Sequence, residues 1–143
     1  MEKSTQENEA IVSRIYEEAL GFDGDLSRMS TTQRVVYLVE HLMQEVNSGA
    51  SFEQYFRWTT VDEIKQVQPI LGELGLSDVQ RILSVAIDVA FPDGFPQTDE
   101  QKEDFTDWSE EQEEELEKLF NQVEDFNGRV TNTLGHLALR ADA

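Results

Sequence analysis

The sequence of 143 residues contains no cysteine. This absence excludes disulfide bonds, thiolate nucleophiles and cysteine-ligated metal sites. Long apolar runs are also missing, and the first residues are polar or charged where a signal peptide would have an apolar core. The sequence therefore predicts neither a membrane-spanning helix nor a secreted protein, and we expect a cytoplasmic location.

Basic residues are scarce. Lys and Arg number 11 against 30 Asp and Glu, which gives a formal net charge of −19. A chain with this charge repels the phosphates of nucleic acids and of anionic lipids, so we expect direct binding to neither DNA nor membranes. The charge favours cations, basic proteins and proteins that themselves bind DNA as partners.

Sequence motifs of enzymes are missing as well. The two histidines, His41 and His136, lie far apart and outside any zinc-binding spacing. Asp23-Gly24-Asp25 is similar to the start of a calcium loop, but the other ligands of that twelve-residue pattern do not follow. Since no nucleophile elbow, P-loop or dinucleotide-binding glycine motif occurs either, we predict a non-enzymatic chain with no catalytic residue, metal ligand or cofactor.

Helix-start signals are abundant. In a capping box, a Ser or Thr side chain accepts from the backbone amide three residues on, and a Gln or Glu there returns a hydrogen bond. Five such pairs precede plausible helices: Ser30/Gln33, Thr60/Glu63, Ser77/Gln80, Thr98/Gln101 and Ser109/Gln112. No segment alternates as a strand would, so the sequence predicts an all-α bundle of about seven or eight helices with no significant sheet.

Turn residues separate the predicted helices. Pro92 is expected to end the helix before it. Candidate turns lie at residues 21–25, 47–49, 74–76 and 92–96. No repeat or long linker occurs, so we predict one helical domain over residues 1–143, with residues 1–6 frayed.

The negative charge is concentrated in the segment 93–125. This segment contains fourteen acidic residues against Lys102 and Lys118, so it contributes −12 of the −19. In the helix predicted to start at Ser109, carboxylates occupy every direction outside the apolar stripe, although like charges four residues apart oppose helix formation. Six of these carboxylates occupy roughly 12 Å of helix axis, about one per 2 Å, whereas duplex DNA presents about one charge per 1.7 Å.

This density suggests mimicry of DNA phosphates by an acidic surface that binds a basic or DNA-binding protein. The residues predicted to form the surface are Asp99, Glu100, Glu103, Asp104, Asp107, Glu110, Glu111, Glu114 and Glu117. Several alternatives stay open at this stage. The acids could form a solvated face, neutralise a basic toxin as an immunity or antitoxin-like protein, hold a metal in a carboxylate site or an enzyme, or reflect a halophilic source. The sequence also leaves open whether the chain forms a homodimer.

The second concentrated feature is the aromatic block of residues 52–58. Four of its seven side chains are aromatic, and we interpret it as a short helix that fills the core.

A predicted helix leads into Asn47-Ser48-Gly49, and Phe52-Glu53-Gln54-Tyr55-Phe56 follows. With these segments, residues 34–126 resemble a bacterial family of domains of unknown function that includes a DNA-mimic protein. Later matching segments lie at residues 70–75, 82–91 and 116–120. Ser48 replaces a usual Gly, two residues are inserted before Phe52, and Trp58 and Thr59 stand where the family has Asn and Gly.

The resemblance implies an all-α, non-enzymatic protein. It also implies that an acidic surface similar to DNA binds a transcription factor, as in the characterised member of the family. The family-motif residues are expected to be structural: Asn47, Gly49, Phe52, Gln54, Tyr55 and Phe56.

Overall fold

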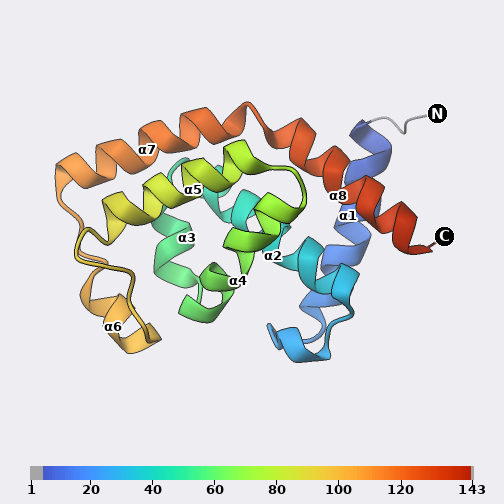
Figure 1. The fold of residues 1–143 in the computed structure, drawn as a ribbon, viewed down its shortest axis with the longest axis horizontal. Helices are drawn as coiled ribbons and strands as arrows, with labels where there is room; N and C mark the ends of the chain where they lie inside the picture. Colours follow the sequence, from blue (N-terminus) through green and yellow to red (C-terminus); the bar gives the residue numbers. More distant parts are fainter. Residues whose placement is uncertain (1–4, 143) are drawn as a thin grey trace. The chain divides into compact units, whose positions relative to one another are not determined.

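The computed structural model describes residues 5–142. That part of the chain contains eight α-helices, one 3-10 helix and no strand, which confirms the predicted all-α class. The helices are α1 (Thr5–Leu20), η1 (Leu26–Arg28), α2 (Thr31–Gly49), α3 (Glu53–Trp58), α4 (Val61–Glu73), α5 (Ser77–Ala90), α6 (Asp99–Asp104), α7 (Glu110–Glu124) and α8 (Asn127–Asp142) (Figure 1). Of the start that was predicted to fray, residues 1–4 lie outside the described residues.

The chain divides into two compact units, which are described separately. The terminal unit comprises residues 1–41 and 126–143, and the central unit comprises residues 42–125. Helix α2 contributes its first part to the terminal unit and its last turns to the central unit. The organisation as one domain stays a prediction.

In the terminal unit, α1 crosses and packs against α8 (Figure 1). The two helices approach closely at Gly135, where a Cβ atom would overlap the buried Asn8 carboxamide. Asn8 Nδ2 donates to Asn132 Oδ1 at 3.0 Å, so the carboxamide is held in place beside the glycine. Both helices also bury apolar side chains, Val12, Ile15 and Ala19 on α1 and Val130, Leu134 and Ala138 on α8.

In the central unit, α5 packs against both α4 and α7 (Figure 1). Each of these helices buries apolar side chains, such as Leu71 of α4, Leu83 of α5 and Leu116 of α7. Each fully buried large aliphatic or aromatic side chain contributes about 1.5–3 kcal/mol. The aromatic block forms α3 and fills the core as predicted, because Phe52, Tyr55 and Phe56 are at most 1% exposed. Trp58 differs from them, since it is 72% exposed.

Four of the five predicted caps form. Ser30, Thr60, Thr98 and Ser109 each accept a hydrogen bond from the amide three residues on, at 3.1–3.2 Å. At Ser30 and Ser109 the Gln side chain also accepts a hydrogen bond of 2.9 Å from the backbone amide of the serine, so these two capping boxes are complete. The local pattern thus fixes where most of these helices begin.

The cap predicted at Ser77 is wrong. Leu76 is the N-cap of α5, and no side chain caps this helix. Gln80 Nε2 instead donates to the carbonyl of Gln68 on α4 at 2.9 Å. Gly72 makes room for this contact, since a Cβ atom there would lie 2.9 Å from the same nitrogen. A contact between helices has therefore overridden the local signal.

The turn predicted at residues 47–49 is also wrong, because α2 continues through Gly49. Asn47 Nδ2 donates back to the carbonyl of Met43 at 2.6 Å, which is compatible with the helix. The chain turns one residue later, at Ala50, whose φ of 52° lies in the left-handed region. The other three predicted turns lie between helices.

Candidate acidic interaction surface

The short helix α6 is anchored to the end of α3 by a buried lysine. Lys102 is 4% exposed, and its Nζ donates to the carbonyls of Phe56 and, at 3.1 Å, of Arg57. These carbonyls belong to the last turn of α3, where a helix has unsatisfied acceptors that favour a cation. Burial lowers the pKa of the Lys102 ammonium, and Asp99 and Glu103 act in the opposite direction. Lys102 is therefore part of the scaffold of the acidic segment.

Asp99 connects the start of α6 to the start of α4. Its Oδ1 accepts from the backbone amide of Val61 at 2.8 Å, in the first turn of α4. A carboxylate is stabilised at this position by the amides and the dipole of the helix. Asp99 thus has a structural role in addition to the predicted one, and its side chain is fixed.

The start of α7 is fixed against the end of α5 by two side chains. Trp108 is buried, and its Nε1 donates to the carbonyl of Ala90 at 3.1 Å. Gln112, which completes the capping box of Ser109, donates through Nε2 to the carbonyl of Val89 at 2.9 Å. These contacts direct the apolar stripe of α7 to the core and its glutamates to solvent.

All nine acidic residues predicted to bind a partner are exposed. On α7, the helical period places Glu110, Glu114 and Glu117 on one side and Glu111 roughly 100° away from Glu110. On α6 the same geometry places Asp99 and Glu103 together and Glu100 and Asp104 on another side, while Asp107 lies between the two helices. The predicted set is thus distributed over more than one face, and its binding role stays a prediction.

Glu53 on α3 lies near carboxylates of α7. Burial raises the pKa of Glu53, and the nearby Glu113 and Glu117 raise it further, while a hydrogen bond from Ser51 and the charge of Arg57 lower it. We call Glu53, Glu110, Glu113, Glu114 and Glu117 the acidic face.

Two of these residues were not in the predicted set. Glu113 could have been found, because it lies four residues before Glu117 on the same side of α7. Nothing in the local sequence indicates Glu53, since its place depends on how α3 packs.

Few cations neutralise the segment. Lys118, on the far side of α7 from Glu113, pairs with Glu115 at 3.2 Å. Both side chains are more than half exposed, and such pairs contribute at most about 1 kcal/mol. Lys102 is buried and Lys118 is paired with Glu115, and the five carboxylates of the acidic face form no salt bridge with any residue that the structure describes.

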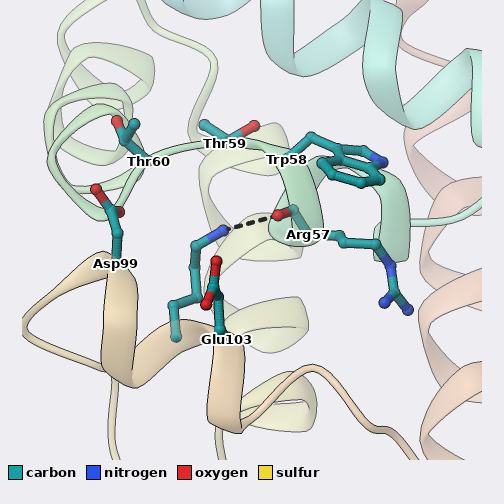
Figure 2. A pocket seen from close by; sticks show the side chains of 7 residues that line it. Arg57, Trp58, Thr59, Thr60, Asp99 and Glu103 are labelled. Atoms are coloured by element: carbon teal, nitrogen blue, oxygen red, sulfur yellow. Dashed lines mark hydrogen bonds between the residues drawn. The ribbon is translucent and has the colours of Figure 1, made fainter.

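A pocket of about 230 Å³ lies where α3 meets α6 (Figure 2). Trp58 lies on the α3 side of this pocket, and Asp99 and Glu103 rise from α6 (Figure 2). We call it the α6 pocket; its lining residues are Arg57, Trp58, Thr59, Thr60, Asp99, Lys102 and Glu103. The Thr59 hydroxyl on its wall is buried and makes no hydrogen bond with any residue that the structure describes.

Within residues 5–142, no group of three or more His, Asp or Glu side chains is arranged to hold a metal ion. Over the same residues, no helix is both long and apolar enough to cross a membrane.

A family model described as DMP19-like protein matches residues 27–139, a range that includes the acidic face and the α6 pocket. No curated protein and no solved structure matches the chain.

Proposed function

The chain belongs to the DMP19-like protein family, a family of DNA mimics, and from this premise we propose that it binds the DNA-binding surface of a basic protein such as a transcription factor. In this proposal the chain is not an enzyme and competes with DNA for its partner. The observation that carries the proposal is the acidic face, in which the side chains of α7 and α3 combine.

The spacing of the carboxylates supports the proposal. Glu110, Glu113, Glu114 and Glu117 advance along α7 by roughly 3.5 Å of axis per charge. Along one strand of DNA, successive phosphates advance by about 3.4 Å. A row of basic side chains that is placed to meet one strand can therefore meet this face in a similar register.

The rigidity of the face supports it as well. The contacts of Trp108 and Gln112 fix the start of α7, the helix that carries four of the five carboxylates of the face. Carboxylates held in place lose less conformational entropy on binding than carboxylates on a mobile tail. Their negative potential also accelerates the encounter with a basic partner, and salt screens this effect.

The test compares two triple variants of equal charge change. The first, Glu110→Gln with Glu114→Gln and Glu117→Gln, neutralises the acidic face; the second neutralises Glu9, Glu17 and Glu18, which are exposed on α1. Each protein is immobilised and exposed to a lysate at low and at high salt. Captured proteins are identified by mass spectrometry, purified, and tested for release from duplex DNA by the chain.

We expect a DNA-binding protein that is captured at low salt, lost at high salt and displaced from DNA by the wild-type chain. The first triple variant should bind it at least about tenfold more weakly, at roughly 0.5 kcal/mol or more per charge, and the α1 variant should bind like wild type. The proposal fails if no basic protein is captured at low salt, or if both variants bind equally well. Capture of a basic toxin that does not bind DNA would favour the immunity-protein alternative.

A further inference from the structure

The exposure of Trp58 needs an explanation that the core does not provide. Its neighbours Phe52, Tyr55 and Phe56 are at most 1% exposed, whereas Trp58 is 72% exposed at the end of the same short helix. A single exposed apolar side chain is ordinary on a protein surface. Trp58 differs because it borders the α6 pocket, whose opposite side carries the carboxylates of Asp99 and Glu103 (Figure 2).

The cations that line the pocket are already engaged. The Lys102 ammonium is buried against the carbonyls of Phe56 and Arg57. The Arg57 guanidinium lies 5.3 Å from the ring centre of Trp108 and donates to the carbonyl of Thr106 at 3.4 Å. In Figure 2 this guanidinium extends away from Asp99. Asp99 and Glu103 act on the Lys102 charge, and Asp99 Oδ1 accepts from the Val61 amide, but both carboxylates are exposed and form no salt bridge with any described residue.

We infer that the α6 pocket receives one arginine side chain of the partner, held between the indole of Trp58 and the carboxylates of Asp99 and Glu103. This inference rests on the proposed function, because it assumes a partner with a basic surface. It adds a specific anchor to a surface that would otherwise act through its charge alone. Tryptophan and arginine are both enriched among the few residues that contribute most to binding at protein interfaces.

The chemistry of the pocket selects arginine over lysine. A guanidinium is planar, stacks on an aromatic face and donates two parallel hydrogen bonds to a carboxylate, whereas an ammonium is a compact, strongly hydrated charge. The indole is also the aromatic group that attracts cations most strongly. The volume fits a side chain better than a small molecule, because small-molecule pockets begin at about 300 Å³.

The test uses the full chain labelled with ¹⁵N and three short capped peptides of sequence Gly-Ser-X-Ser-Gly, in which X is arginine, lysine or citrulline. Citrulline has the shape of arginine without its charge. The indole N–H signals of the two tryptophans separate the sites, because Trp58 is exposed and Trp108 is buried and bonded to Ala90. Titrations are run at constant ionic strength on wild type and on Trp58→Ala, Glu103→Gln and Glu9→Gln.

We expect the arginine peptide to shift the Trp58 indole signal and the amide signals of α6 in a saturable way, and to leave the Trp108 indole unchanged. The lysine peptide should bind more weakly and the citrulline peptide weakest. Trp58→Ala and Glu103→Gln should each weaken the arginine peptide by about threefold or more. Glu9→Gln should have no effect.

The inference is overturned if the arginine peptide shifts signals evenly over the acidic residues, if Trp58→Ala binds as wild type does, or if no signal shifts saturably. None of these outcomes bears on the α7 triple variant, so the proposed function can stand when the arginine pocket fails. If the captured partner is in hand, Trp58→Ala should weaken its binding while the salt dependence keeps its slope, whereas neutralisation of the acidic face should lower that slope.

Discussion

The two units of the molecule are built alike but charged very differently. The central unit has 21 acidic and five basic side chains, a net charge of −16, whereas the terminal unit has nine acidic and six basic ones, a net charge of −3. Both units consist of amphipathic helices packed through apolar stripes. The fold of such helices therefore does not require the charge of the central unit.

The difference argues against a general adaptation such as a halophilic surface, which would be expected to charge both units. Within α7, glutamates four residues apart repel each other and destabilise the helix by a few tenths of a kcal/mol per pair. The complete capping box at Ser109 and the contacts of Trp108 and Gln112 offset this repulsion. A helix that keeps such repulsion and is fixed by several specific contacts is better explained by binding than by solubility.

The largest effect on stability is expected at Lys102, whose ammonium holds the acidic segment to α3. Lys102→Met keeps most of the stem but leaves the carbonyls of Phe56 and Arg57 without this donor. We expect a loss of about 2–3 kcal/mol in the free energy of unfolding, measured by urea denaturation. Lys118→Met is the matched control, and it should lose less than about 1 kcal/mol. Equal losses would show that Lys102 acts only as one more positive charge among many acids.

The second effect tests the terminal unit, where packing and not charge is critical. Gly135→Ala places a methyl group against the buried Asn8 carboxamide and should cost about 1–3 kcal/mol in thermal or urea unfolding. Gly128→Ala on the same helix meets nothing within 4 Å and should be neutral or stabilising by up to about 1 kcal/mol.

Gly135→Ala should lower the free energy of unfolding by less in the Asn8→Ala background than in wild type, because the group that the methyl would overlap is then absent. Purely additive losses in the double variant would mean that the glycine is required for another reason.

The third prediction compares the stability of variants at two serines, Ser109 and Ser77, that both start a capping-box pattern in the sequence. Ser109→Ala removes the cap of α7 and should cost about 1 kcal/mol of unfolding free energy. Ser77→Ala removes a side chain that caps nothing, so its stability should stay within about 0.5 kcal/mol of wild type. A larger loss at Ser77 than at Ser109 would contradict the assignment of the caps.

This pair also shows what the sequence could and could not predict. Capping boxes and helical periodicity depend on neighbours within a few residues, so the helices and four of their caps were predictable. The prediction of a cap at Ser77 was wrong because the Gln80 side chain donates to the Gln68 carbonyl of the neighbouring helix. The prediction of a turn at residues 47–49 was wrong because Asn47 donates to the Met43 carbonyl within the helix, and the left-handed residue that ends the helix is Ala50.

The candidate site was likewise predictable only where residues close in the sequence determine it. The exposure of the α7 glutamates follows from the helical period, and that of the nine predicted residues is confirmed. The position of Glu53 beside Glu113, the burial of Lys102 and the α6 pocket each depend on how α3 meets α6 and α7. No local pattern carries that information, since residues more than 40 positions apart form each of these contacts.

The smallest effect is electrostatic and concerns the acidic face itself. Burial and the charges of Glu113 and Glu117 raise the pKa of Glu53 above its usual 4.5. Between pH 4.5 and this raised pKa, the folded chain binds more protons than the unfolded chain, so the contribution of Glu53 to stability falls as the pH rises. Above the raised pKa the penalty is complete and constant.

Glu53→Gln removes this penalty, so we expect the variant to gain stability over wild type as the pH rises from 4.5, by less than about 1 kcal/mol at neutral pH. The measurement is the difference in unfolding free energy between the two proteins at several pH values. Glu111→Gln is the control, because it removes a carboxylate on the other side of α7, and at neutral pH it should gain less stability than Glu53→Gln. A flat difference for Glu53→Gln would mean that neither burial nor the α7 carboxylates raise the pKa of Glu53, and the acidic face would then consist of α7 alone.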